Sequence, residues 1–154
     1  ALESRGGVFY LQDRVGKNGK VFKLLKFRSM RPNADKGSQI TIGNRDPRIT
    51  RTGYFIRRFK LDEFPQFINV LLGEMSVVGP RPFAIEQMAL YERRALIKYL
   101  SVKPGLTGSW QVYARHDTTF ACRAKYDQLY VDQASFVLDL ALVAKTPMAM
   151  LRGQ

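Results

Sequence analysis

Two adjacent carboxylates, Asp62 and Glu63, are the residues whose types and spacing best suit chemistry. They follow closely on the basic pair Arg57-Arg58. Because nearby positive charge favours the ionised form of a carboxyl group, we expect Asp62 to keep its charge. Such a carboxylate can serve as a nucleophile or as a metal ligand. A structural explanation competes, in which Asp62 caps a helix and Glu63 is a first-turn acid.

The composition narrows the chemistry. The chain has 154 residues, with 25 Lys and Arg against 13 Asp and Glu, and a formal charge of +12. This charge implies an anionic partner, which could be nucleic acid, an anionic membrane surface or a phosphorylated small substrate. A single cysteine, Cys122, and a single histidine, His116, exclude a disulfide framework and a zinc cluster of Cys and His.

The element that must position the carboxylates is predicted to be a helix that starts at Asp62 and stops at Gly73. Pro65 is tolerable in its first turn. The free amides and the dipole of that turn favour anions, so a substrate phosphate could dock there. The helix is inferred from apolar residues at helical spacing, namely Phe64, Phe67, Ile68, Leu71 and Leu72.

Ahead of this helix, turn signals predict a β-hairpin. Its strands are residues 8–12 and 20–27, and its turn contains Asn18-Gly19, the pair most typical of tight hairpins. Residues 31–48 are rich in Pro, Asn, Asp, Gly and Lys, which predicts a long polar loop.

The second half of the chain is predicted to be mainly helical. Pro80 and Pro82 fix the backbone on both sides of Arg81, which is a way to aim a guanidinium. Pro147 is expected to bend or end the last helix, whose apolar stripe suits either packing or lying on a bilayer surface. The predicted elements are helices at 84–100, 119–131 and 135–150 and a short strand at 110–112.

Together these elements predict one α/β (α+β) domain over residues 1–154, mostly helical, with an N-terminal β-hairpin and several amphipathic helices. A doubly wound sheet is not expected, because no Gly-rich nucleotide fingerprint of the Rossmann or P-loop type is present.

Ordered sequence blocks run through the chain. The first are Val8-Phe9-Tyr10-Leu11-Gln12-Asp13-Arg14-Val15-Gly16, Phe22-Lys23-Leu24-Leu25-Lys26-Phe27-Arg28-Ser29-Met30 and Asp46-Pro47-Arg48-Ile49-Thr50-Arg51. The later ones are Leu61-Asp62-Glu63-Phe64-Pro65-Gln66, Gly73-Glu74-Met75-Ser76-Val77-Val78-Gly79-Pro80-Arg81-Pro82 and Lys103-Pro104-Gly105-Leu106-Thr107-Gly108-Ser109-Trp110-Gln111-Val112. In type and order they resemble the bacterial sugar transferase family, the monotopic polyprenyl-phosphate phosphoglycosyl transferases.

The resemblance implies an enzyme that transfers a sugar-1-phosphate from a UDP-sugar to polyprenyl (undecaprenyl) phosphate and releases UMP. It implies Asp62 as the nucleophile of a covalent phosphosugar-aspartyl intermediate, and Glu63 as a catalytic residue that helps hold Mg²⁺. It also implies a set of phosphate-binding residues, which are Lys26, Arg28, Arg81 and Arg115. Without the resemblance, Arg81 could be an exposed turn residue and Lys26 an edge-strand charge.

The resemblance further implies a membrane-associated monotopic catalytic domain at the cytoplasmic face of the bacterial inner membrane. Family members carry a hydrophobic membrane segment ahead of the Gly-Val-Phe block. We therefore expect this sequence to lack an N-terminal membrane segment of the native protein and to be soluble as given. The expected partners are UDP-sugar, polyprenyl phosphate and the membrane surface, with a homodimer left open. Such an enzyme takes the first membrane step of exopolysaccharide, capsule or O-antigen synthesis.

The alternative function is a basic nucleic-acid-binding module. It is motivated by the charge of +12 and by aromatic residues next to basic ones, as in Phe22-Lys23 and Phe27-Arg28. No helix-turn-helix, RNA-recognition or zinc-finger signature supports it, so no nucleic acid is expected as a partner.

Overall fold

The computed structural model of the chain describes residues 7–31 and 46–152. Most of the predicted polar loop, residues 32–45, lies outside the described residues. The described part combines α-helices, short 3₁₀ turns and two small sheets, which confirms the mixed, largely helical α/β class. Within residues 7–31 and 46–152, no helix is both long and apolar enough to cross a bilayer.

The chain forms two compact units, and each is described by itself. The first unit consists of Ala1–Leu11 and Leu25–Pro65, and the second of Gln12–Leu24 and Gln66–Gln154. The single catalytic domain over residues 1–154 stays a prediction.

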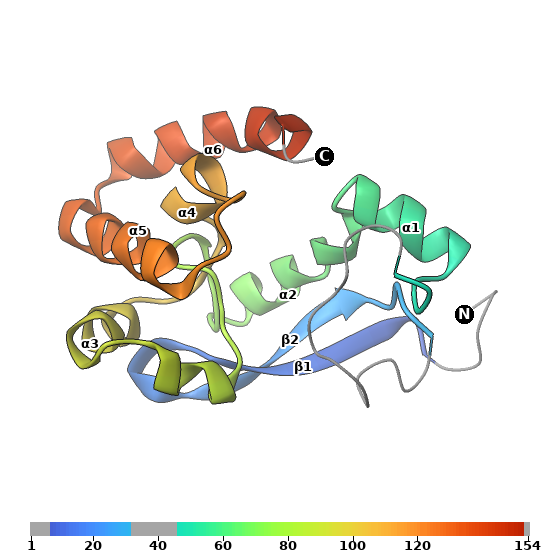
Figure 1. Ribbon diagram of the computed structural model, residues 1–154, viewed down its shortest axis with the longest axis horizontal. Coiled ribbons are helices and arrows are strands. Elements are labelled where there is room, and N and C mark those ends of the chain that lie inside the picture. Colours follow the sequence, from blue (N-terminus) through green and yellow to red (C-terminus); the bar gives the residue numbers. More distant parts are fainter. Residues whose placement is uncertain (1–6, 32–45, 153–154) are drawn as a thin grey trace. The chain divides into compact units, whose positions relative to one another are not determined.

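The predicted hairpin is confirmed, with a longer first strand. Strands β1 (Phe9–Val15) and β2 (Val21–Phe27) pair with each other (Figure 1). Their connection is too short for a parallel crossover, so the pair is antiparallel. Asn18 and Gly19 take positive φ angles of 57° and 76° in the turn, as the Asn-Gly signal predicts. The backbone amide of Gly16 closes the turn on the carbonyl of Lys20, at 2.8 Å.

In the first unit, helix α1 (Arg51–Arg58) lies shortly after residue 46, where the described chain resumes. It was not predicted, although its N-cap signal is clear: the Thr50 hydroxyl accepts from the amide of Gly53 at 2.9 Å. Gly53 packs so closely on the carbonyl of Ser29 that a Cβ atom there would collide with it. The end of β2 and the start of α1 are therefore fixed against each other by backbone contact.

The helix predicted from Asp62 is wrong in its start and in its buried face. Residues Leu61–Glu63 form a 3₁₀ turn, η4, and helix α2 spans only Gln66–Leu71. Gln66 and Asn69 are buried, whereas the predicted apolar stripe is exposed, with Leu71 at 87%. Asn69 is satisfied in its buried position, because its Nδ2 donates to the carbonyl of Lys23 at 2.8 Å and to Glu74 Oε2 at 2.7 Å.

The second unit is organised around the parallel pair of β3 (Ser76–Val78) and β4 (Gly105–Thr107). Gly79 and Gly105 face each other so closely that a Cβ on either would meet backbone atoms. The remaining helices and turns of this unit can be followed in Figure 1. They are η5 (Ile85–Leu90), α3 (Arg93–Ser101), α4 (Ser109–Tyr113), α5 (Phe120–Gln133) and α6 (Phe136–Arg152).

Two predictions for this unit need correction. The helix over 84–100 is broken at Tyr91, which is extended because its ring is buried against Phe83 at 4.9 Å. Residues 110–112 belong to a helix, since the chain turns after the extended Gly108. The last predicted helix is confirmed as α6, and Pro147 lies inside it and does not end it.

Side-chain contacts explain why helix α6 continues past Pro147. The hydroxyl of Thr146 donates to the carbonyl of Leu142 at 2.7 Å and lies 2.7 Å from the hydroxyl of Thr107 on β4. Leu142 itself is fully buried. These contacts hold the helix where Pro147 removes a backbone hydrogen bond. Helix α5, predicted over 119–131, is confirmed over Phe120–Gln133, and Thr119 is its N-cap.

Candidate functional site

Asp62 lies in the 3₁₀ turn η4, directly after a backbone reversal at the end of α1. Lys60, the N-cap of η4, has the left-handed conformation with φ 57° and ψ 19°. The Oδ1 atom of Asp62 is buried and has no hydrogen-bond partner among the described residues. A buried, unsatisfied carboxylate oxygen is costly, so it calls for an explanation beyond packing.

The pKa of Asp62 is raised above its ordinary value of 3.8. Burial is the main cause, and repulsion by Glu63 adds to it. Lys26, Lys60 and Arg57 act in the opposite direction. The surrounding cations do favour the ionised form, as expected, but desolvation outweighs them, so the net shift of the pKa is upward. A raised pKa makes the carboxylate more basic.

Three segments of the first unit bring their charges to Asp62. Lys26 comes from strand β2, Arg57 from the last turn of α1 and Lys60 from the reversal that follows it. Of these, Lys26 was predicted as a site residue, whereas Arg57 and Lys60 were not. Recognition of Thr50 as a helix cap in the sequence would have predicted α1, whose last turn contains Arg57.

Glu63 follows Asp62 in the same turn and is half-buried. Two adjacent carboxylates supply the oxygen donors that Mg²⁺ prefers, and such sites commonly use one or two carboxylates together with substrate phosphates. Within the described parts of the chain, no cluster of three or more acidic, Cys or His side chains could hold a metal by itself. The donor set fits Mg²⁺ only if substrate and water complete it.

Arg28, also predicted to bind phosphate, lies just past the end of β2 and is half-buried. Its backbone amide donates to the carbonyl of Val8 at 2.8 Å, which ties together the open end of the hairpin. The first unit thus contains Lys26, Arg28, Asp62 and Glu63.

Arg81 belongs to the second unit, in the segment that follows β3. Each carbonyl from residue 80 to residue 83 accepts a hydrogen bond from another segment of that unit. The donors are the Gly105 amide to Pro80 (2.8 Å), Arg123 and the Tyr99 hydroxyl to Arg81 (3.4 Å for Tyr99), Arg14 to Pro82 (3.5 Å) and the Val15 amide to Phe83 (3.0 Å). The backbone that carries Arg81 is therefore held along its whole length.

Arg115 lies in the connection between α4 and α5, after the buried Ala114. The fold of this connection is set by Asp117. Its backbone amide donates to the carbonyl of Ala114 at 2.9 Å, and its own carbonyl accepts from the Trp110 indole at 3.0 Å. Arg115 is half-buried, whereas His116 beside it is exposed. Arg81 and Arg115 thus lie in one unit, and the carboxylate pair with Lys26 and Arg28 in the other.

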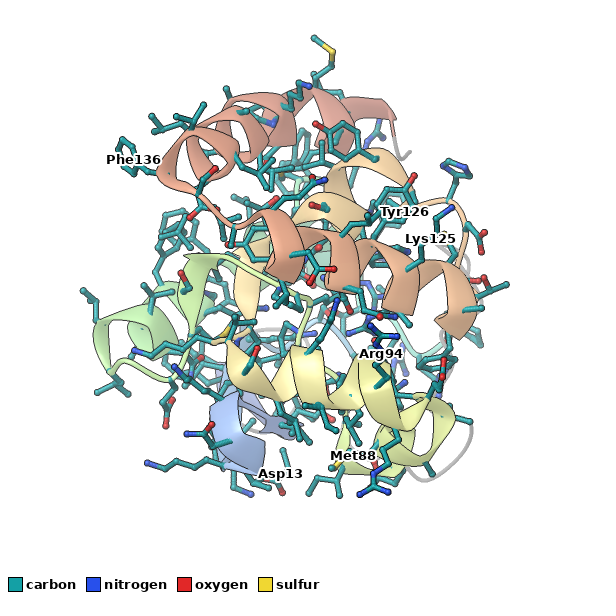
Figure 2. The ribbon with its side chains drawn as sticks, turned by 90° about the vertical axis from the view of Figure 1, so that its left-hand side faces the viewer. Asp13, Met88, Arg94, Lys125, Tyr126 and Phe136 are labelled. Carbon is teal, nitrogen blue, oxygen red and sulfur yellow. The ribbon has the colours of Figure 1, made fainter. Side chains whose placement is uncertain are left out.

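The second unit also contains an open groove of about 500 Å³ beside α3 and α5. Figure 2 shows this face, with Arg94 on α3 and Lys125 on α5. The groove is lined in part by Ala95, Phe120, Ala124 and Lys125, and by none of the six predicted site residues. Its size alone does not make it the reaction site.

Comparisons with known proteins bear on these residues. The sequence model of the family described as "Bacterial sugar transferase" matches residues 1–153. The exopolysaccharide production protein ExoY of Sinorhizobium fredii is 40% identical over 156 residues, covering 92% of this chain and 69% of that protein. The undecaprenyl-phosphate galactose phosphotransferase of Salmonella typhimurium is 39% identical, over 96% of this chain and 34% of that protein.

A third relative has a fuller name, UDP-glucose:undecaprenyl-phosphate glucose-1-phosphate transferase, and comes from Xanthomonas campestris. It is 42% identical, over 97% of this chain and 33% of that protein. The chain thus spans about two thirds of ExoY and about a third of the two transferases. These similarities give no support to the nucleic-acid-binding alternative.

Proposed function

Because the chain belongs to the bacterial sugar transferase family, we propose that it transfers a sugar-1-phosphate from a UDP-sugar to undecaprenyl phosphate. The relatives named for such reactions support the donor and the acceptor. The observation that carries the proposal for this chain is Asp62 itself, a carboxylate among cations with a buried oxygen that has no hydrogen-bond partner within residues 7–31 and 46–152.

The reaction needs two displacements at one phosphorus atom. In the first, a carboxylate oxygen of Asp62 attacks the phosphorus that carries the sugar, and the bond to the bridging oxygen of the diphosphate breaks. UMP leaves with that electron pair, and an acyl phosphate joins the sugar to Asp62. In the second, an oxygen of undecaprenyl phosphate attacks the same phosphorus and displaces the Asp62 carboxylate. The product is undecaprenyl-diphosphate sugar.

Asp62 is suited to both displacements. Its raised pKa means a more basic, poorly solvated carboxylate, which attacks more readily than an exposed one. Lys26, Arg57 and Lys60 favour its ionised form and can stabilise negative charge that develops on the phosphate oxygens. The acyl phosphate, once formed, is an activated group that the acceptor can cleave.

The other predicted residues receive binding roles. Glu63 would help to hold Mg²⁺, which when bound neutralises charge on the diphosphate. Arg28, Arg81 and Arg115 would bind phosphate oxygens, for which the planar guanidinium is well shaped. We assign the protein to the cytoplasmic face of the inner membrane, where its lipid acceptor resides. The exposed apolar side chains of α6, including Val137 and Phe136 (the latter labelled in Figure 2), support contact with lipid.

The proposal is tested by incubating the protein with a panel of UDP-sugars, Mg²⁺ and undecaprenyl phosphate in detergent. UMP release and transfer of labelled sugar into the lipid phase are expected for at least one donor. With labelled donor and no acceptor, label should stay on the protein, and peptide mapping should locate it at Asp62.

An Asp62→Asn variant should lose both the adduct and the transfer. Asp132→Asn is the matched control, because Asp132 is an exposed carboxylate on α5. Full activity of the Asp62→Asn variant would refute the assigned nucleophile, and silence of the unaltered protein towards every UDP-sugar would refute the function.

A further inference from the structure

A buried cation on α5 contacts the segment that carries Arg81. Arg123 is only 9% exposed, and its guanidinium donates from Nη2 to the carbonyl oxygen of Arg81. The same guanidinium lies over two aromatic rings, 5.9 Å from the centroid of Phe83 and 5.7 Å from that of Trp110. Neither the charge pattern nor the sequence blocks singled out this residue.

The position of Arg123 is fixed from behind by a second buried charge. Its Nε lies 3.8 Å from Oδ2 of Asp127, one helical turn further along α5. Asp127 is 4% exposed and also accepts a hydrogen bond from the hydroxyl of Tyr91 at 3.2 Å. The pair thus joins the aromatic core of the second unit to the carbonyl of Arg81.

Core packing alone does not explain this pair. Taking a guanidinium and a carboxylate out of water costs several kcal/mol per ion, and apolar side chains of similar volume often serve a core equally well. The Nε atom of Arg123 makes no hydrogen bond within the described part of the chain. The main interaction that burial of the Arg123–Asp127 pair makes possible is therefore the hydrogen bond from Nη2 of Arg123 to the carbonyl of Arg81.

That carbonyl determines how the Arg81 side chain is aimed. Pro80 and Pro82 cannot donate backbone hydrogen bonds, and each has a fixed φ. Once the peptide plane between Arg81 and Pro82 is held, the Cα–Cβ direction of Arg81 has little freedom left. Tyr99 donates to the same oxygen at 3.4 Å, which is a longer contact than a normal hydroxyl hydrogen bond.

We propose that Arg123, held by Asp127, is the positioning residue of Arg81, and that it sets the direction in which Arg81 meets a phosphate group. The proposal rests on the function given above, in which Arg81 binds the diphosphate of the donor. Arg123 itself touches no substrate, because it is buried behind the segment. It acts only through the backbone of Arg81.

The test is a double-mutant cycle on UMP release, using Arg81→Met, Arg123→Lys and the combination of both. In Arg123, Nε faces Asp127 while Nη2 reaches the carbonyl of Arg81. Lysine keeps the charge but has a single nitrogen, which cannot do both. Arg123→Lys alone should lower kcat/KM by about 10- to 100-fold, as small displacements of a positioning group do. In the Arg81→Met background it should cost less than about twofold further, because the residue through which it acts is gone.

Arg94→Met is the matched control, since Arg94 is an exposed arginine on α3 in the same unit (Figure 2). It should leave kcat/KM within about twofold of the unaltered protein. Equal losses from Arg123→Lys in both backgrounds would overturn the proposal, since they would indicate a role independent of Arg81.

A second measurement does not depend on turnover. Hydrogen exchange of the peptide that covers residues 79–90 should accelerate in Arg123→Lys and not in Arg94→Met. Unchanged exchange in this peptide would overturn the proposal. If the unaltered protein released no UMP, the function would fail while this exchange measurement still decided whether Arg123 holds the segment.

Discussion

Lys60 takes a left-handed backbone conformation two residues before Asp62. Its positive charge partly offsets the rise in the Asp62 pKa that burial causes. Glycine is the usual residue in this conformation at a helix end, because a Cβ atom there costs roughly 1–2 kcal/mol. A lysine at such a position therefore places a cation beside the carboxylate at the expense of local stability.

Replacing Lys60 separates these two effects. Both Lys60→Gly and Lys60→Ala remove the cation, so the pKa of Asp62 should rise and the acidic limb of the pH–rate profile should move to higher pH. Only Lys60→Gly relieves the left-handed strain, and it should be more stable than Lys60→Ala by about 1 kcal/mol. Urea unfolding and pH–rate profiles measure the two. Equal stability of both variants would contradict the left-handed assignment.

Asp62→Asn should abolish transfer without harming the fold. The pKa of Asp62 is raised in the folded state, so the folded protein binds this proton more tightly than the unfolded chain does. That stabilisation is complete below the ordinary pKa of 3.8 and is lost as the pH rises through the folded value. At pH 7 a neutral asparagine avoids the loss.

For this variant we expect a fall in transfer on the order of 10³-fold or more. The unfolding midpoint at pH 7 should be unchanged or higher by up to about 3 °C, the shift that about 1 kcal/mol produces at this chain length. Calorimetry at pH 7 and pH 4 measures it. A clearly lower midpoint at pH 7 would show that ionised Asp62 stabilises the fold.

Asp127, in the second unit, makes the free energy of unfolding depend on pH. Burial raises its pKa to about 6, against the opposing influence of Arg123 and the hydrogen bond from Tyr91. The buried hydroxyls of Tyr91 and Tyr99, which also face it, have raised pKa values and stay neutral in this range. The folded state therefore holds the Asp127 proton more tightly between about pH 4 and pH 6, and stability from this group falls as the pH rises.

Asp127→Asn should remove that dependence. Relative to the unaltered protein, the variant should gain about 1–3 kcal/mol of unfolding free energy between pH 4 and pH 7. Urea unfolding at four pH values measures the difference, and Asp132→Asn on the same helix is the exposed control. A difference that stays constant with pH would contradict the raised pKa.

On α2 the polar residue Asn69 is buried and the apolar residue Leu71 is exposed, so we expect the polar substitution to cost more stability. Asn69→Ala should cost about 2–3 kcal/mol, because it leaves the carbonyl of Lys23 and the carboxylate of Glu74 without their donor. Leu71→Ala, on the same helix, should cost less than about 0.5 kcal/mol, because this leucine is 87% exposed. Urea unfolding of the two variants decides. A larger loss for Leu71→Ala would put the apolar face in a core.

Features with local signals could be predicted from the sequence. The hairpin follows from Asn18-Gly19, and α5 follows from its Thr119 cap. The buried face of α2 could not, because Asn69 finds its partner on Lys23, 46 residues earlier in the chain. The break at Tyr91 likewise depends on contacts with α5, namely its hydrogen bond to Asp127 and its ring contact with Phe120.

The site shows the same division. Asp62, Glu63 and Lys26 could be named from motifs that resemble a family, and Lys26 does act on Asp62. The sign of the Asp62 pKa shift could not be predicted, because composition shows the nearby cations but not the burial that outweighs them. Arg123 gave no signal, since a buried arginine and an exposed one look alike in a sequence.

The four successive carbonyls from residue 80 to residue 83 place a limit on how this segment can vary. Because the donors lie on β1, α3, β4 and α5, inserting or deleting one residue there would put all four carbonyls out of register at once. Exchange of the Arg81 side chain leaves those bonds in place. On the proposed function, a change in the preferred UDP-sugar is therefore easier to reach by substituting side chains in this segment, or by changing the length of other segments. A change in the length of this segment would disrupt its backbone hydrogen bonds.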